Sequence, residues 1–362
     1  MFAGDRAATI SPGGHAQRGI FAKEIPDPKR QRRFRERALR DPRDCCIIEA
    51  SETEAERFCS SLRQTRIFQR FYDMRFQHQS TGVFEMQVRL IALDLDGTTL
   101  CSDHLTLPEP NRIAIARAAS QGVQVVISTG RIRGRIPQQL REIPGLRYAV
   151  TSNGAAVCDL MTGETLYSNP VPQDLALRVL REIAPFGLYT ELYCCGSSYV
   201  DRQGDAILSR IPVSEGRRAM IRSSREQVES LSALAAQPDA CVEKINLPFI
   251  PPHQIEEVWA LLGSIGGLAV TSSVAGNAEV NAASANKGDG LSHLCGRLGI
   301  RPEEVMAVGD NGNDLEMLRF AGLAVAPKNA LPEIRELADH VTASNDDCGV
   351  AQAIDRFVPY TK

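Results

Sequence analysis

From Met86 onward, short apolar segments that end in polar or acidic residues alternate with segments of helical periodicity. Val88–Leu93 runs into Asp94, and residues 305–308 run into Gly309 and Asp310 in the same way. Continuous apolar runs of this length are typical of parallel strands that are buried on both faces. Their alternation with helices predicts βαβ units, and therefore an α/β fold with a doubly wound parallel sheet of the Rossmann-like kind.

A second pattern interrupts this alternation. Residues 169–273 contain helix-like and strand-like stretches of their own, and a block of roughly 100 residues has the usual size of a domain. We therefore expect a core made of residues 86–168 and 274–362, with a second α/β domain inserted at 169–273. The core pattern is expected to resume near Val280.

Residues 1–85 differ in composition from the rest of the chain. They hold 16 Lys and Arg against 12 Asp and Glu, whereas the remainder holds 25 basic and 32 acidic residues. We expect a poorly structured basic extension. It could serve as an arm for nucleic acid or as an organelle transit sequence, or it could reflect a start assigned too early, with translation beginning at Met86.

The overall composition narrows the class of function. The formal net charge of −3 argues against nucleic acid as the main partner, but it permits a small anionic substrate. The 10 cysteines in 362 residues include no C-x-x-C, which favours reduced thiols in a cytoplasmic protein. Because no stretch approaches about 18 consecutive apolar residues, no membrane span is expected.

The sharpest chemical signal is the acidic loop Asp94-Leu95-Asp96-Gly97-Thr98 at the end of the first strand. Ligands of open α/β sheets bind at the carboxyl ends of strands, where this loop must lie. Two carboxylates so close would repel each other, and a divalent cation such as Mg²⁺ resolves the conflict. An ordinary turn would explain Asp96-Gly97 but not the other acid.

Three further segments point to phosphate and metal chemistry. Ser128-Thr129-Gly130-Arg131 follows the second strand and can cradle a phosphate with its hydroxyl and backbone N–H groups. Gly309-Asp310-Asn311-Gly312-Asn313-Asp314 follows a later strand and is rich in oxygen ligands, and Lys287 precedes it. Each segment alone could be turn chemistry or a solvated lysine. The order of all these segments along the chain makes turn chemistry or a solvated lysine an improbable explanation for the whole set.

In that order, the motifs resemble those of the haloacid dehalogenase superfamily, specifically its Cof-type sugar-phosphatase branch. The resemblance covers roughly 275 residues. One departure stands out, because Pro327-Lys328 replaces the Met-Gly pair usual before Asn-Ala and brings an extra positive charge. The matching residues are Asp94-x-Asp96-Gly97-Thr98, Ser128-Thr129-Gly130-Arg131, Asn153-Gly154, Lys287-Gly288, Gly309-Asp310-x-x-Asn313-Asp314, Asn329-Ala330 and Gly349-Val350-Ala351.

This resemblance implies a phosphatase that forms a phosphoaspartate on Asp94, with Asp96 as the general acid and base. It implies an inserted cap domain that closes over the site and reads the leaving group. Mg²⁺ is expected on the Asp94 carboxylate, the Asp96 backbone carbonyl and Asp310, with Asp314 orienting Lys287 or a metal-bound water. Phosphate and substrate contacts are expected from Leu95, Thr129, Gly130, Lys287 and Asn313.

Two other functions stay open at this point. A phosphomutase would use the same aspartate but return the phosphoryl group to a sugar. A regulatory or binding protein could keep this fold without catalysis, although the complete motif set argues against that. The expected substrate is a small phosphorylated metabolite, and sugar phosphates, phosphorylated cofactors and short phospho-acids are all compatible with the sequence.

Overall fold

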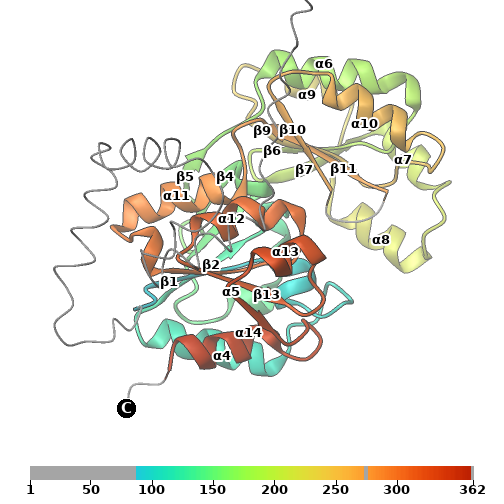
Figure 1. Cartoon of the computed structure of the whole chain (residues 1–362). Coiled ribbons are helices and arrows are strands. Elements are labelled where there is room, and N and C mark those ends of the chain that lie inside the picture. Colours follow the sequence, from blue (N-terminus) through green and yellow to red (C-terminus); the bar gives the residue numbers. More distant parts are fainter. Residues whose placement is uncertain (1–86, 273–275, 360–362) are drawn as a thin grey trace, which may run out of the picture. The chain divides into compact units, whose positions relative to one another are not determined.

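Two β-sheets organise residues 87–272 and 276–359, the part of the chain that the computed structural model describes (Figure 1). The basic extension expected at residues 1–85 lies outside these residues. Within them, the first sheet has the spatial order β14 (His340–Thr342), β13 (Leu323–Pro327), β12 (Val305–Val308), β1 (Leu90–Leu93), β2 (Gln124–Ser128), β3 (Tyr148–Thr151), β4 (Ala156–Asp159) and β5 (Thr165–Ser168).

The first sheet is the predicted parallel core. The strands from β14 to β3 pair in parallel, and only β4 and β5 are antiparallel. Strand β1 lies near the middle, where Leu90 pairs with Val305 on one side and with Gln124 on the other. The loops after β1, β2 and β12 therefore meet at one edge of the sheet.

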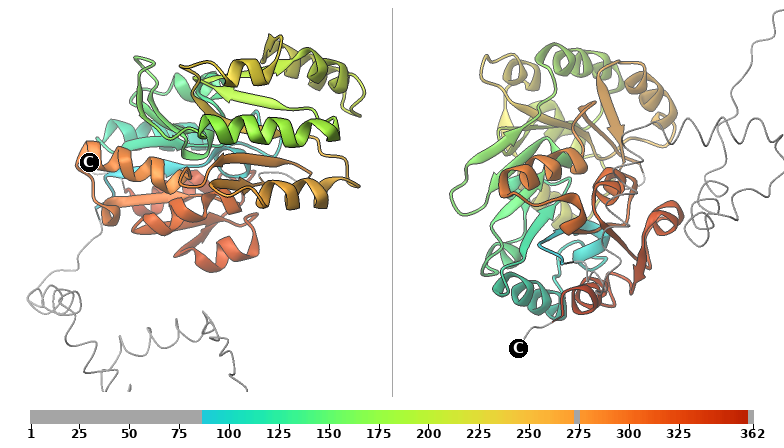
Figure 2. Two further views of the ribbon diagram at one scale, coloured as in Figure 1. Left: turned by 90° about the horizontal axis from the view of Figure 1, so that it is seen from above. Right: turned by 60° about the vertical axis from the view of Figure 1, so that its left-hand side comes forward.

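Helices cover both faces of this sheet, as the sequence predicts (Figures 1 and 2). Successive side chains of β1 point to opposite faces: Ile91 and Leu93 join one buried cluster, whereas Leu90 and Ala92 join the other. The first face is covered by α4 (Glu109–Ser120), α5 (Gln138–Arg141) and α14 (Gly349–Phe357). The second is covered by α11 (Lys287–Leu298), α12 (Leu315–Phe320) and α13 (Pro332–Leu337).

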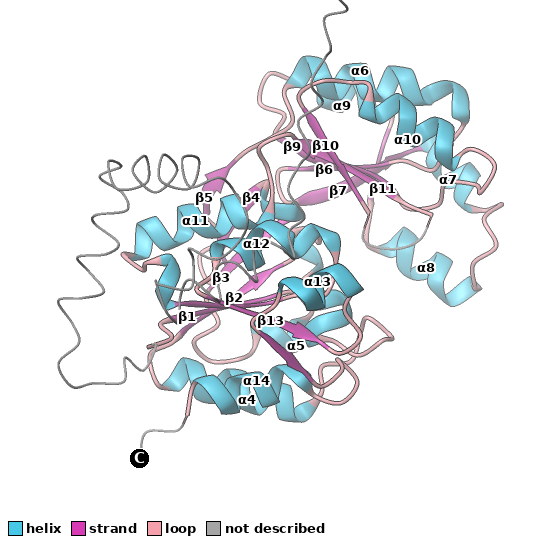
Figure 3. Ribbon diagram, viewed as in Figure 1, coloured by secondary structure: helices cyan, strands magenta, loops and turns pink. Residues whose placement is uncertain are grey.

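The second sheet is built differently, with one apolar face and one polar face. Its spatial order is β10 (Leu268–Thr271), β11 (Ala278–Ala282), β9 (Val242–Leu247), β6 (Glu191–Cys194), β7 (Ser197–Asp201) and β8 (Glu226–Val228). The apolar face packs on α6 (Gln173–Ile183), α9 (Leu231–Ala235) and α10 (Ile255–Gly263) (Figure 3). Two further helices, α7 (Arg202–Leu208) and α8 (Glu215–Ser223), enclose a small cluster around Tyr189.

The expected return to the core at residue 274 is wrong. Strand β11 belongs to the second sheet, where it pairs antiparallel with β10 and β9. The reason is its alternation: Ala278 and Val280 continue the apolar face of the second sheet, whereas its polar residues point the other way. The chain contributes to the first sheet's layers again only with α11, which begins at Lys287.

The remaining helical elements are single turns that shape the loops. They are η2 (Leu95–Thr99), η3 (Arg133–Arg135), η4 (Ser152–Gly154), η5 (Ala184–Phe186), η6 (Pro302–Glu304) and η7 (Gly312–Asp314). Across residues 87–272 and 276–359, no helix is both long and apolar enough to cross a membrane. Pro327, part of the departure from the family pattern, is the last residue of β13, and Lys328 after it is exposed.

Candidate active site

The loop after β1 presents the two carboxylates that the sequence singles out. Asp94 directly follows β1 and is buried, and Asp96 lies two residues later in η2. Gly97 has a φ of +87°, and a Cβ atom there would lie 2.5 Å from Oδ2 of Asp310. Only glycine therefore allows this loop to approach the loop after β12 so closely. Thr98 fastens the approach, because its hydroxyl donates to Oδ1 of Asp310 over 2.6 Å.

Lys287 lies at the centre of the site rather than on the surface. Its ammonium is fully buried and lies 2.5 Å from Oδ1 of Asp94 and 2.6 Å from Oδ1 of Asp314. The first turn of α11 holds it there, with Asn286 capping the helix by accepting from the Asp289 N–H. Although burial opposes it, the two carboxylates raise the pKa of Lys287, which stays protonated.

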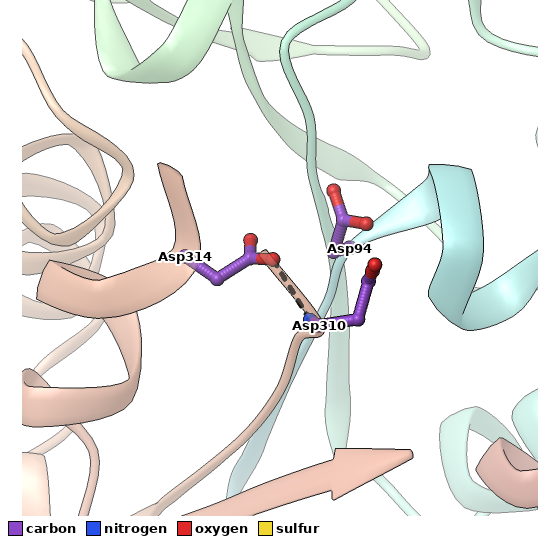
Figure 4. A group of neighbouring side chains, drawn as sticks. All are labelled: Asp94, Asp310 and Asp314. Carbon is purple, nitrogen blue, oxygen red and sulfur yellow. Dashed lines mark hydrogen bonds between the residues drawn. The ribbon is translucent and has the colours of Figure 1, made fainter. Parts of the chain in front are cut away.

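Three carboxylates converge where the metal is expected. Ligand oxygens of Asp94, Asp310 and Asp314 all lie within 4.8 Å of one another (Figure 4). Burial and the nearby carboxylates raise the pKa of Asp94 well above its usual value, against the opposing charge of Lys287. Burial and Asp314 likewise raise the pKa of Asp310 to about 6. The three carboxylates repel one another, and their oxygens are ligands that Mg²⁺ prefers, so the group fits a Mg²⁺ ion.

Asp314 also shapes the loop after β12. Its Oδ2 accepts the backbone N–H of Asp310 over 2.9 Å (Figure 4). The same oxygen accepts the backbone N–H of Asn311 over 3.0 Å, while Oδ1 accepts from Lys287. One side chain thus orients both the lysine and the backbone that carries Asp310.

The Asp96 carboxylate is held away from this acidic group. Arg131 donates from Nε to Oδ2 over 2.8 Å and from Nη2 to Oδ1, and the ring of His104 contacts Oδ1 at 3.0 Å. Burial acts in the opposite direction, but these hydrogen bonds and charges lower the pKa of Asp96. In this arrangement Asp96 is ionised. Its carboxylate takes no part in the three-carboxylate group, so only its backbone carbonyl is available for the expected metal role.

The phosphate cradle expected at Thr129 and Gly130 follows β2, the strand next to β1. Thr129 is buried, and its Oγ1 accepts from the Arg131 backbone N–H over 3.1 Å. Asn153, in the loop after β3, closes this side: a Cβ atom on Gly130 would lie only 2.8 Å from its Oδ1. Asn313 reaches the same oxygen from the loop after β12, at 3.3 Å.

The structure thus brings most of the predicted residues to one edge of the first sheet. Leu95 differs, because its side chain is buried in the core and only its backbone could contact a substrate. From the sequence, no role is assigned to Arg131, His104 or Asn153. Arg131 and Asn153 lie within the quoted motifs, so the sequence could have singled them out as site residues. His104 carried no signal, because its approach to Asp96 depends on a backbone with a φ of +58°.

Comparisons with known proteins identify the family of this chain. Residues 91–354 match the family of haloacid dehalogenase-like hydrolases. The phosphatase YwpJ of Bacillus subtilis is 29% identical over 287 residues, which cover 75% of this chain and 100% of that protein. The 5-amino-6-(5-phospho-D-ribitylamino)uracil phosphatase YcsE of Bacillus subtilis is 30% identical over 278 residues, covering 76% of this chain and 97% of that protein.

A solved structure extends the likeness to three dimensions. A haloacid dehalogenase-like hydrolase from Bacillus subtilis is similar with a TM-score of 0.65 and 28% identity, covering 74% of this chain and 99% of that one. The parallel core, the four site loops and these relatives lead to one conclusion. The chain belongs to the haloacid dehalogenase-like hydrolases and is a phosphatase of their Cof-type branch.

Proposed function

We propose that this phosphatase hydrolyses small phosphorylated metabolites, such as sugar phosphates, in a Mg²⁺-dependent reaction through a phosphoaspartate on Asp94. The observation that carries the proposal is the position of the Asp94 carboxylate. It is buried at the carboxyl end of β1, in contact with Lys287 and beside Asp310 and Asp314. A carboxylate there is held by a fixed cation and is shielded from bulk water, as a nucleophile toward phosphorus requires.

In the first half-reaction, a carboxylate oxygen of Asp94 forms a bond to phosphorus while the bond from phosphorus to the leaving oxygen breaks. Asp96, protonated for this step, gives its proton to that leaving oxygen. In the second, water attacks phosphorus, the bond to Asp94 breaks, and Asp96 takes the proton of the water. The ionised Asp96 of the structure, bound by Arg131, has the protonation state from which this second step starts, whereas the first step requires it to take up a proton against its lowered pKa.

The remaining site residues position the phosphoryl group. In this proposal Thr129, the Gly130 N–H and Lys287 bind its oxygens. Asn313 and the backbone at Leu95 supply further contacts. Mg²⁺ held by Asp94, the Asp96 carbonyl and Asp310 would neutralise the repulsion between carboxylates and phosphate. Asp314 keeps Lys287 and Asp310 in place.

The substrate class is proposed from a relative of the chain. The relative YcsE is named for a phosphorylated ribitylamino compound, which carries a polyhydroxyl chain. We propose that the second sheet with its helices acts as a cap domain and selects such leaving groups. We also propose a cytoplasmic location, because the described cysteines are free thiols.

The test is phosphate release from a panel of sugar phosphates and phosphorylated cofactors, with Mg²⁺ or with EDTA. Wild type should release phosphate only with Mg²⁺, and Asp94→Asn should lose turnover while keeping the same melting temperature within a few degrees. Substantial turnover by Asp94→Asn would rule out the phosphoaspartate. Isomerised sugar phosphate without free phosphate would indicate a mutase instead.

A further inference from the structure

The second sheet has a polar face that is almost completely buried. Strand alternation places Glu191 and Tyr193 of β6, Lys244 and Asn246 of β9, and Glu279 and Asn281 of β11 opposite the face that carries the helices. Each of these six residues is at most 7% exposed. Charged side chains are seldom buried unless they are paired, so their partners show what this face is built to contact.

Lys244 links this polar face to the phosphate cradle. Its Nζ donates to the backbone carbonyl of Gly130 over 2.6 Å and lies 3.1 Å from Oε2 of Glu279. The ammonium also lies 4.7 Å from the centre of the Tyr193 ring. Lys244 is 2% exposed, so its charge is used within the protein rather than solvated.

This contact fixes one peptide of the cradle at both ends. Lys244 holds the carbonyl of the Gly130–Arg131 peptide, and the N–H of the same peptide donates to Thr129 Oγ1 over 3.1 Å. Oγ1 is thereby oriented as an acceptor toward the backbone, which directs its own hydrogen elsewhere. A free Gly130–Arg131 peptide could rotate, and the hydroxyl and N–H groups that face the phosphate would lose their alignment.

Glu279 extends the link to the neighbouring loop. Its Oε2 accepts from Asn153 Nδ2 over 2.6 Å, and Asn153 Oδ1 in turn contacts Asn313. A Cβ atom on Gly130 would lie 3.4 Å from the same Glu279 oxygen. The Lys244–Glu279 pair therefore touches the loops after β2 and β3 together, at the place where they approach each other.

From these contacts we infer that Lys244 is a positioning residue of the phosphatase reaction. Carried by the second sheet, it orders the Thr129–Gly130 cradle through the Gly130 carbonyl, with Glu279 as its counterion. The inference rests on the proposed function for the identity of the bound group. It differs from a role in leaving-group recognition, because a residue that orders the cradle affects every phosphorylated ligand equally.

The test compares Lys244→Met with wild type for binding of inorganic phosphate in the presence of Mg²⁺, and for kcat/KM with a sugar phosphate and with para-nitrophenyl phosphate. Loss of a hydrogen bond from a charged donor should weaken phosphate binding about ten- to a hundredfold. The same factor should reduce kcat/KM for both substrates. Unchanged phosphate affinity, or a loss confined to the sugar phosphate, would overturn the inference.

Two further variants test whether Lys244→Met acts only through a general loss of structure. Lys244→Met combined with Glu279→Gln removes both charges, and the side-chain carbonyl introduced by the second substitution can still accept from Asn153. This double variant should regain the melting temperature but not the phosphate affinity. Arg225→Met is the matched control, because Arg225 is a buried cation of the same region whose carboxylate partner is Glu191. If Arg225→Met weakens phosphate binding as much as Lys244→Met does, the effect of Lys244→Met is a general structural one and the inference is wrong.

The binding measurement also separates this inference from the proposed function. If wild type releases no phosphate from any compound, the proposed function fails. The measurement of inorganic phosphate binding still tests the role of Lys244. If wild type binds phosphate no more tightly than Lys244→Met does, the inference about Lys244 is wrong.

Discussion

Protons and Mg²⁺ should compete for Asp310. Burial and the Asp314 carboxylate raise the pKa of Asp310 to about 6, and a carboxylate binds Mg²⁺ in its ionised form. In the metal-free protein, about nine-tenths of Asp310 would be protonated at about pH 5 and very little at about pH 8. The apparent dissociation constant for Mg²⁺ should therefore be about tenfold higher at the lower pH.

The same competition affects the stability of the fold. Raising the pKa of Asp310 from 3.8 to about 6 corresponds to about 3 kcal/mol by which its ionised form destabilises the metal-free folded state. This destabilisation is complete above about pH 6, decreases as the pH falls from there and vanishes only below 3.8, because between these values the folded state holds a proton that the unfolded state has released. Bound Mg²⁺ removes the same repulsion, so it should raise the melting temperature more at about pH 8 than at about pH 5.

Calorimetric titration with Mg²⁺ and thermal unfolding at the two pH values measure both effects. Asp310→Asn should bind Mg²⁺ much more weakly and lose the part of the pH dependence that comes from Asp310, while the part that comes from Asp94 stays. Asp355→Asn is a suitable control, because Asp355 is an exposed carboxylate of α14 that pairs with Arg117. Equal Mg²⁺ affinity at both pH values, or wild-type affinity in Asp310→Asn, would refute the assignment of Asp310 to the metal site.

Two other substitutions test the packing of the site by chemical denaturation. Lys287→Met should cost about 3–5 kcal/mol, because it leaves Asp94 and Asp314 as buried carboxylates without their cation, whereas Lys328→Met on the surface should change stability little. Gly154→Ala should cost more than about 2 kcal/mol, since its Cβ would lie 1.9 Å from the Asn286 carbonyl oxygen; Gly122→Ala, at φ +85° with open space around it, should show only the smaller cost of backbone strain.

The core and its loops could be predicted because their signals are local. Leu90–Leu93 is apolar at every position, which marks a strand buried on both faces, and Asp94 follows it without a gap. Parallel strands align their carboxyl ends, so Asp94, Thr129 and Asp310 had to meet if the strands were placed correctly. The position of Lys287 followed only from resemblance, because neither its burial nor its reach to Asp94 can be read from neighbouring residues.

The second sheet could be predicted less well from the sequence, because its arrangement depends on which strands pair with each other. Alternation within β11 places Glu279 on one face, but it does not say which sheet the strand joins, and this is why the domain boundary was set too early. The register between β6 and β9 shifts near Tyr193 and Cys194, where Tyr193 pairs with Lys244 and Cys194 with Val242. An irregularity of this kind changes which side chains share a face, and no sequence pattern announced it.

The buried charges of that sheet carry a structural consequence. Lys244 and Glu279 would be strongly destabilising in an apolar interior, and an ion pair between them offsets only part of the cost of removing both from water. Further polar contacts of the pair reach Gly130 and Asn153, in loops of the first sheet. Burial of the polar face is therefore more favourable when those loops present the Gly130 carbonyl and the Asn153 amide to it. The fold thus stabilises this conformation of the cradle before any phosphate binds.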